Sequence, residues 1–453
     1  MTQLGEAVHR YHRILEAVPS ETSEWMAQLR EQMQARGLVV NSRPVSPVVR
    51  PHFISRRQYS NLLKATETLT SAIGRVRDLV ISQPALMARM DLLPAEKMLS
   101  AVDPGYSAPP VAALLDSGLL NNEVHVFGGV GDLPSGVLYG EALADVFLNS
   151  GPLKALKKKY KYKLTRTGGS RPLISAVMKA WKEFGGRTQP RIAILQLRLP
   201  FDTIECNEAL LLAEVLRQAG YPVQVANPED LEYRDGILST PTGPIDLLWR
   251  NVRAHEFLMH FDLRHALVRA YRDRAVCVVN SFRAELTRKR ALLALLTDEQ
   301  VTAKFPAAER HAIKSAIPWT RLVSQSKTHH NGTLVDLPEF ILKNREQLVL
   351  RPNDGSLDAE APAYDGASTS ERDWARALRT ALGHGYVVQQ RGERESAQFP
   401  MDQYGDLVYR DFVVGLSAHS FMGKAHGCTT RLSAAGGFST MSGFAPSFVL
   451  ESH

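Results

Sequence analysis

The sequence has few cysteines: 453 residues include only Cys206, Cys277 and Cys428, with no C-x-x-C pair. This excludes a disulfide framework and a zinc site built on paired cysteines, and it is typical of buried free thiols in a reducing compartment. No apolar run reaches the roughly 18 residues that a transmembrane helix needs. The first residues also lack the apolar core of a signal peptide. We therefore expect a cytoplasmic protein with no membrane contact.

Charge of one sign is only in small excess. The net charge is +7, while 44% of the residues are hydrophobic and 22% charged. These values are typical of a globular chain, long enough here for two or three domains. The weak positive bias permits anionic partners without requiring them, and we expect no nucleic-acid partner. The lysine-rich run within 151–171 is predicted to be a solvated helix face or hinge, with a phosphate-facing patch as the alternative.

Hydrophobic periodicity predicts an α/β (α+β) fold. Helices are expected over 1–36, interrupted at Pro19, and over Ser55–Ser82, with further helical segments across 84–120. Strands alternating with helices predict a parallel layer, and ligands of such sheets gather beyond the carboxyl ends of the strands. The strands of this layer are 191–198, 222–226, 245–249 and 275–279. Later elements are a helix over 282–300, a helix over 370–382, and two antiparallel strands over 408–414 and 418–424.

Glycines are scarce where a phosphate-binding loop would need them. A strand over 348–350 ends at the cation Arg351, and the following loop carries only two glycines up to Gly366. Its four carboxylates repel phosphate, and few glycines limit the approach of backbone N–H groups. They are Asp354, Asp358, Glu360 and Asp365.

Three positively charged or polar positions are candidates for nucleotide binding. Arg290 and Arg351 together could grip a polyphosphate, and surface or salt-bridge arginines are the alternative. The strand from Tyr386 to Gln390 could be a hinge against which an adenine lies. Almost any buried strand gives the same pattern, so both interpretations stay open.

Carboxylates that could hold magnesium are missing from the C-terminal region. No Asp or Glu occurs between Asp411 and Glu451, although phosphoryl chemistry on ATP needs carboxylates that converge on the metal. No G-x-S-x-G motif occurs either. His419 and Cys428 are close in sequence, but a satisfied structural histidine is the simpler interpretation.

Several blocks nevertheless occur in a familiar order. They are LLPAEKMLSAVDPGY (92–106), PSGVLYGEALADVF (134–147), GPIDLLWRNV (243–252), CVVNSFRAELTRKRALLALLTDE (277–299), IPWTR (317–321), LVLRPND (348–354), YVVQQR (386–391) and GCTTRLS (427–433). In this order they resemble the circularly permuted ATP-grasp proteins, related to glutathionylspermidine synthase-like and eukaryotic glutathione synthetase-like ligases. The resemblance spans about residues 52 to 450. It implies ATP, magnesium and an acyl phosphate that an amine or thiol attacks.

The resemblance also implies a division of the chain. N-terminal helices and a proline-rich arm are expected over 1–52. A helical region with the first part of an ATP-grasp-like core follows over 53–188. An α/β domain covers 189–281, and an ATP-grasp-like domain covers 282–453.

Several positions depart from what the resemblance implies. Gly128 and Val130 stand where relatives carry a Glu-x-Asn metal motif, with Asp132 retained nearby. Gly415 and Ser417 replace an Asp-x-Asp-like pair. We therefore expect no metal site, the remaining candidate ligands being Asp132 and Asp354.

Other positions of the resemblance keep a basic or polar side chain. Arg290 and Arg351 take the place of phosphate-binding lysines, and Gln390 that of an acidic residue after the hinge strand. A Gly-Gly-Lys loop is replaced by 356–362. Arg250 and Arg431 match family arginines and are candidates to hold a substrate carboxylate.

Two main functions follow from this pattern, beside a third: a small-anion or metabolite sensor, or a site repurposed for metal-free chemistry, whose arginines bind a carboxylate or phosphate ligand. The first is a catalytically degenerate ATP-grasp protein that needs neither ATP nor magnesium. It would act as a binding or scaffolding subunit, with a protein partner or as a homo-oligomer. The alternative is an active ATP-dependent ligase that joins a small carboxylate to an amine or thiol, with ATP and magnesium as cofactors.

Overall fold

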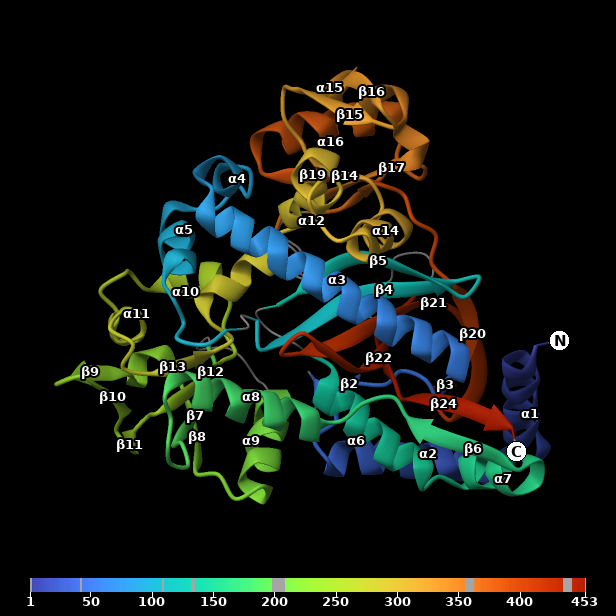
Figure 1. Ribbon diagram of the computed structural model, residues 1–453. Helices are drawn as coiled ribbons and strands as arrows, with labels where there is room; N and C mark the ends of the chain where they lie inside the picture. Colours follow the sequence, from blue (N-terminus) through green and yellow to red (C-terminus); the bar gives the residue numbers. More distant parts are fainter. Residues whose placement is uncertain are drawn as a thin grey trace.

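A computed structural model describes residues 2–40, 43–107, 110–131, 135–197, 208–354, 362–434 and 442–452. The fold mixes helices with three larger sheets, each in its own region of the molecule (Figure 1). The α/β (α+β) prediction is therefore confirmed. Among the helices described, none is both long and apolar enough to cross a membrane.

The central sheet has six strands taken from two distant parts of the chain. Its order is β23-β22-β21-β4-β5, and β20 pairs with β21 off this path. The bounds are β4 Ala112–Leu120, β5 Glu123–Val130, β20 Ser396–Gln403, β21 Asp406–Phe421, β22 Lys424–Ala434 and β23 Gly443–Ala445. The long helix α3 (Arg56–Ser82) lies across one face of this sheet (Figure 1).

Helix α3 follows from its sequence. Ser55 and Gln58 form a capping box at its start. Its apolar stripe, which includes Leu62 and Leu69, packs against Leu115 and Leu416 of the sheet. This packing assigns one face of the sheet to the core and leaves the opposite face for polar side chains.

Strand β4 corrects the expectation of helix up to residue 120. Asn121 and Asn122 have φ values of 52° and 66°, as a two-residue type I′ hairpin requires, and they join β4 to β5. Asn is one of the few residues that adopt this conformation at low cost. The turn, rather than the apolar run before it, decides between helix and strand.

The two strands expected over 408–414 and 418–424 are wrong as separate elements. They form the single strand β21, and Gly415 to Ser417 lie inside it. The chain reverses only at Met422 and Gly423, which have φ values of 49° and 78°, and continues as β22.

The predicted parallel layer is confirmed. A four-stranded sheet has the order β13-β12-β7-β8 with every neighbouring pair parallel. The bounds are β7 Ile192–Leu195, β8 Val223–Ala226, β12 Leu247–Arg250 and β13 Cys277–Val279, with the helices α8 Ser170–Phe184, α9 Glu208–Gln218, α10 Ala254–His260 and α11 Ala266–Arg272. Around it lie η1 Pro228–Asp230, β9 Glu232–Arg234, β10 Ile237–Thr240, β11 Gly243–Pro244 and α5 Pro94–Ala101, while α4 Pro84–Ala88 packs against α3.

A smaller antiparallel sheet, of order β14-β19-β17-β18, lies at the top of the molecule (Figure 1). Its strands are β14 Thr320–Leu322, β17 Leu348–Pro352, β18 Tyr364–Asp365 and β19 Tyr386–Gln390. The helices and remaining strands of this region are α14 Ala307–Ala316, β15 Lys327–His330, β16 Thr333–Asp336, α15 Leu337–Lys343, η3 Arg345–Gln347 and α16 Glu371–Gly383. Leu348, Leu350 and Val388 pack with Trp374 of α16 on one face of the sheet.

The single helix predicted over 282–300 is wrong. The segment divides into η2 Phe282–Thr287, α12 Ala291–Leu296 and the start of α13 Glu299–Thr302. The break falls at the basic residues Arg288 and Lys289, which are buried among acidic side chains.

The N-terminal helices and the lysine-rich run form the lower right of the molecule (Figure 1). The elements are α1 Gln3–Ala17, α2 Pro19–Ala35, β1 Val39–Val40, β2 Arg43–Pro44, α6 Val137–Leu148 and α7 Gly151–Tyr160, with a sheet of β3 His52–Ser55, β24 Ser447–Ser452 and β6 Tyr162–Arg166.

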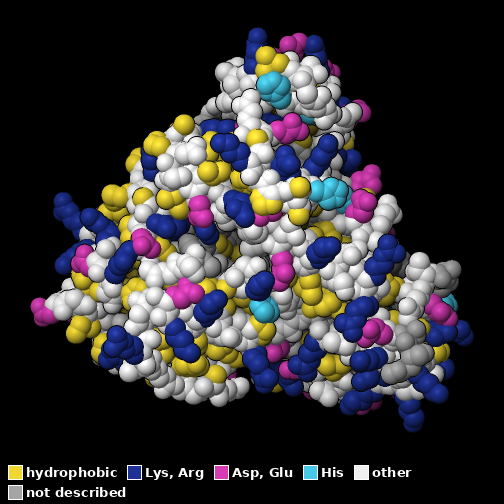
Figure 2. All heavy atoms as spheres, viewed as in Figure 1, with side chains coloured by type: hydrophobic (Ala, Val, Ile, Leu, Met, Phe, Trp, Pro, Cys, Tyr) yellow, Lys and Arg dark blue, Asp and Glu magenta, His cyan; other side chains and the backbone are white. Residues whose placement is uncertain are grey.

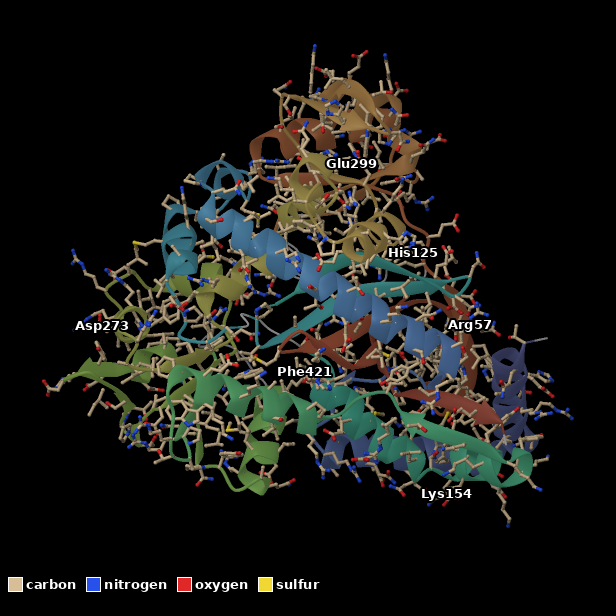
Figure 3. All side chains as sticks on the ribbon, in the orientation of Figure 1. Arg57, His125, Lys154, Asp273, Glu299 and Phe421 are labelled. Carbon is tan, nitrogen blue, oxygen red and sulfur yellow. The ribbon has the colours of Figure 1, made fainter. Side chains whose placement is uncertain are left out.

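The lysines of α7 form the solvated helix face that the sequence predicts. Lys154, Lys157, Lys158 and Lys159 are exposed. Basic side chains gather in this corner of the space-filling view (Figure 2), and Lys154 points away from the body of the molecule (Figure 3).

Candidate functional site

Arg290 and Arg351, predicted from distant segments, lie together in the structure. Arg351 is at the end of β17, and Arg290 caps α12. The link between them is the segment after β17: Nη1 of Arg290 donates to the carbonyl of Pro352 at 2.7 Å, and the Asn353 side chain accepts from the amide of Ala291 at 2.8 Å. Burial and the positive charge of Arg351 lower the pKa of Arg290 to about 10.

Asp116 of β4 stands next to this pair and holds a further cation, Arg394. Nη1 and Nη2 of Arg394 donate to Oδ1 and Oδ2 of Asp116 at 3.2 and 2.8 Å. Burial raises the pKa of Asp116, but the positive charges of Arg394, Arg351 and Arg431 outweigh it, so the pKa is lowered. The carboxylate is therefore ionised at neutral pH.

Arg431 of β22 lies on the same polar face of the sheet as Asp116, two strands away. Its Nη2 donates to Oγ of Ser135 at 2.9 Å, and its guanidinium carbon lies 5.5 Å from the centre of the Phe444 ring. Burial raises the pKa of Glu208, and the positive charge of Arg431 offsets part of this shift. The Glu208 carboxylate accepts hydrogen bonds from the amides of Gly136 and Leu138 at the N-terminus of α6.

These residues form what we call the arginine cluster: Asp116 with Arg290, Arg351, Arg394 and Arg431. The cluster thus contains four guanidinium groups and one carboxylate. The Nε atoms of Arg290 and Arg431 are buried without a hydrogen-bond partner, and Arg351 makes no side-chain hydrogen bond or ion pair with the residues described. Buried donors without acceptors are costly. The cluster is therefore suited to an anion with several oxygen acceptors.

Arg250, predicted to hold a substrate carboxylate, lies elsewhere in a buried ion pair. Its Nη1 donates to Oε1 of Glu285 at 2.8 Å, and its Nε donates to the carbonyl of Asn280 at 3.0 Å. Both side chains of the ion pair are at most 2% exposed. Glu285 thus occupies the place of a carboxylate partner, and the substrate role of Arg250 stays a prediction without support from these contacts.

Gln390 is separated from Arg351 by the sheet itself. The register pairs Leu348 with Gln390 and Arg351 with Val387. Because side chains alternate between faces, Gln390 belongs to the face of Leu348 and Arg351 to the opposite one. Gln389 shares the face of Arg351, although its amide nitrogen donates to Oγ1 of Thr320. The nucleotide-binding role of Gln390 stays a prediction.

Of the two candidate metal ligands, Asp354 belongs to the described residues and Asp132 does not. Asp132 lies outside the described residues, as do Asp358, Glu360 and most of the loop expected to replace a Gly-Gly-Lys motif. Oδ2 of Asp354 accepts from Nζ of Lys289 at 2.7 Å, and the same ammonium pairs with Glu96 at 3.0 Å.

Magnesium, which the resemblance implies beside ATP, requires converging oxygen ligands. Gly128 and Gly415 supply none, and the only carboxylate paired in register with Gly128 and Ser417 is Asp116, which already binds Arg394. Within the described ranges, no three His, Cys, Asp or Glu side chains form a group able to hold a metal. The described donor set does not fit a magnesium ion.

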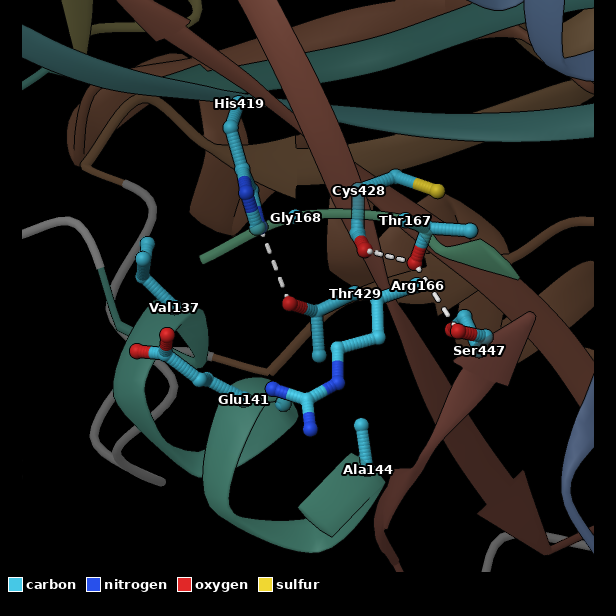
Figure 4. Close-up of a pocket in the computed structure, with 11 residues that line it drawn as sticks. Val137, Glu141, Ala144, Arg166, Thr167, Gly168, His419, Cys428, Thr429 and Ser447 are labelled. Atoms are coloured by element: carbon cyan, nitrogen blue, oxygen red, sulfur yellow. Dashed lines mark hydrogen bonds between the residues drawn. The ribbon is translucent and has the colours of Figure 1, made fainter. Parts of the chain in front are cut away.

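A small enclosed cavity near His419 is not a substrate site. Its volume is about 10 Å³, barely room for one water molecule. Nε2 of His419 lies 2.9 Å from Oγ1 of Thr429 (Figure 4), and burial lowers the pKa of the histidine to about 3. Burial also raises the pKa of Cys428 to about 12. A neutral histidine and a protonated thiol fit the structural interpretation.

Asp116 and Arg394 are the two members of the cluster that sequence reasoning missed. Asp116 gave one signal, a lone carboxylate inside the apolar run ALLDSGLL. Arg394 gave none, because it stands in RGERES with other charged residues between β19 and β20. Their contact joins positions 278 residues apart.

Comparisons with known proteins agree with this fold. No protein-family model matches the sequence, and no curated protein matches it. A glutathione synthetase-like effector from Globodera pallida, solved without ligand, is similar over 95% of this chain and 98% of its own, with a TM-score of 0.62 and 10% identity.

Two further solved structures are less similar. A putative gamma-glutamylcysteine synthetase from Methylobacillus flagellatus matches 85% of each chain with a TM-score of 0.43 and 11% identity. The ATP-grasp ligase PsnB, in complex with a minimal precursor, covers 58% of this chain and 90% of its own, with a TM-score of 0.29 and 11% identity. Of these three likenesses, the one to the effector is close enough to define the fold. The chain therefore has the fold of this glutathione synthetase-like effector.

Proposed function

We propose that this chain is a catalytically degenerate ATP-grasp-like protein that binds a small anionic ligand at the arginine cluster without performing ligation. The observation that carries the proposal is the pairing of the nearby carboxylates with cations of the chain itself. Asp116 is paired with Arg394, and Asp354 with Lys289. Carboxylates engaged in this way are not available to a metal ion.

The same pairing leaves the cluster with an excess of positive charge. Arg290, Arg351 and Arg431 form no ion pair with a carboxylate among the described residues, although Asp116 acts on all three electrostatically. Two of them keep a buried Nε without an acceptor. Guanidinium groups bind phosphate and carboxylate oxygens through charge-assisted hydrogen bonds. These three side chains supply affinity for an anion, while phosphoryl transfer would also require a bridging metal.

Calorimetric titration with AMP-PNP or inorganic tripolyphosphate, in buffer containing EDTA, tests this proposal. Wild-type protein is expected to bind at least one of these probes. Arg351→Met is expected to weaken the binding about tenfold or more, because it removes a charge-assisted contact. Arg372→Met, on the exposed surface of α16, is the matched control and should bind as wild type does.

Turnover separates this proposal from its alternative. A degenerate protein releases no ADP from ATP above the buffer background, whichever acids and amines are supplied with magnesium. Magnesium-dependent release of ADP by wild-type protein that requires both a carboxylate and an amine or thiol, and that is lost in Arg351→Met, would instead establish an active ligase.

A further inference from the structure

Arg394 contacts the central sheet from a segment outside it. The side chain comes from the segment between β19 and β20 and reaches back onto β4, where it forms the two hydrogen bonds with Asp116. Its guanidinium carbon lies 4.2 Å from the centre of the Phe127 ring of β5. The cation is thus held by a carboxylate at its edge and an aromatic ring at its face, two contacts that favour arginine.

Glycines make room for this arrangement. A Cβ atom at Gly415 would lie 3.2 Å from Nη1 of Arg394, and a Cβ atom at Gly392 would lie 2.2 Å from the Phe127 ring. The first distance is tighter than most real contacts, and the second is impossible without movement. A side chain at position 415 and the guanidinium of Arg394 therefore compete for the same space.

These are positions where the resemblance implies metal ligands. The register places Gly128, Asp116 and Ser417 side by side, and Gly415 follows on the same face of β21. In this chain the space beside Gly415 is occupied by Arg394. A glycine at position 415 is therefore compatible with the observed place of Arg394, and a larger side chain there would displace its guanidinium.

We propose that Arg394 is a built-in cation that replaces a divalent metal in anion binding, with Asp116 as the residue that positions it. The inference rests on the proposed anion binding at the cluster. The expected ligand is a small molecule with phosphate oxygens, of the kind represented by a nucleoside triphosphate.

A guanidinium can replace a metal in binding but not in chemistry. Asp116 accepts hydrogen bonds from two of the five N–H groups of the Arg394 guanidinium, which leaves three N–H groups for the oxygens of a ligand. The guanidinium carries one positive charge, whereas Mg²⁺ carries two, and it cannot arrange oxygen ligands in an octahedron. The site should therefore bind such an anion equally well with and without magnesium.

The dependence of affinity on magnesium tests the inference in the full-length protein. AMP-PNP is titrated into each variant in EDTA and again in excess magnesium. Wild type should show affinities equal within about twofold in the two buffers. Arg394→Met should lose about tenfold or more in EDTA and regain part of it in magnesium, because Asp116 is then free to accept a metal. A purely structural role for Arg394 predicts no gain with magnesium.

Further variants keep the test decisive if Arg394→Met does not fold. Arg394→Lys retains a charge but not the bidentate fork, and should show an intermediate loss in EDTA. Asp116→Asn should bind AMP-PNP in EDTA more weakly than wild type, since the carboxylate that positions Arg394 is lost. Adding Asp116→Asn to Arg394→Met should abolish the gain with magnesium. Arg391→Met, three residues earlier in the same segment, is the matched control.

The two proposals fail in different ways. If wild type binds neither AMP-PNP nor tripolyphosphate in EDTA, anion binding without metal is wrong, and the role of Arg394 is overturned with it. If wild type binds in EDTA but Arg394→Met binds equally well, or if magnesium does not strengthen binding by Arg394→Met, only the role of Arg394 is overturned.

Discussion

Lys289 donates a hydrogen bond of 2.7 Å from Nζ to Oδ2 of Asp354, and its Nζ lies 3.0 Å from both carboxylate oxygens of Glu96. The lysine is 2% exposed and Glu96 1%. A cation of the chain therefore already pairs with two carboxylates, one of them a candidate metal ligand.

Replacing Lys289 with methionine should destabilise the fold. Glu96 would remain buried without a counter-charge, and removing one partner of a buried ion pair typically costs about 3–5 kcal/mol. Urea unfolding followed by circular dichroism measures the loss. Lys343→Met, which removes the exposed pair with Glu339, should change stability by less than about 1 kcal/mol. A Lys289→Met protein that unfolds like wild type and binds magnesium tightly would show instead that these carboxylates form a metal site.

Arg250 is expected to stabilise the fold rather than to bind substrate. Arg250→Met leaves Glu285 buried and unpaired, which should lower the free energy of unfolding by about 3–5 kcal/mol. The same urea titration measures it, with Arg253→Met as a less buried comparison in the neighbouring helix. A variant with wild-type stability that has lost affinity for AMP-PNP or for a carboxylate ligand would restore the substrate role.

His419 should make the protein sensitive to acid. Burial holds its pKa at about 3, whereas an unfolded histidine titrates near 6.5. Between these values the unfolded state binds the proton and the folded state does not, so stability falls as the pH decreases. The contribution is about 1.4 kcal/mol per pH unit.

Chemical denaturation at several pH values between 7 and about 4 measures this slope. His419→Gln, which cannot titrate, should show a shallower loss of stability. Equal slopes in the two proteins would mean that His419 is protonated in the folded state or is not responsible.

Gly392 should be required for the placement of Arg394. A methyl group there would lie 2.2 Å from the Phe127 ring, so Gly392→Ala must displace the segment that carries Arg394. We expect a loss of AMP-PNP affinity in EDTA similar to that of Arg394→Met, about tenfold or more. Gly383→Ala, whose Cβ meets nothing within 4 Å, is the control. Unchanged affinity in Gly392→Ala would show that Arg394 does not need this position.

Local patterns predict much of the fold. The stripe of α3 and its cap at Ser55 are read directly from spacing, and the alternation of strands and helices over 190–280 predicts the parallel sheet. The apolar run before Asn121 is ambiguous between helix and strand until the turn is recognised. The split of β21 at Gly415 is wrong because a glycine inside a paired strand gives the same local signal as a turn.

The site is less predictable because it depends on pairing between distant segments. Arg351 could be named from a strand end and Arg290 from a helix after the fourth strand, but the contact of Asp116 with Arg394 depends on how β20, β21 and β4 pair. The face on which Gln390 lies is likewise fixed by the register of β19 with β17. No property of either segment alone contains this information.

The ratio of wild-type affinities for AMP-PNP in EDTA and in magnesium tests the central claim most directly. The account predicts measurable binding in both buffers, with a ratio within about twofold of one, because Arg394 supplies the cation that the site uses. Binding that appears only with magnesium would contradict it.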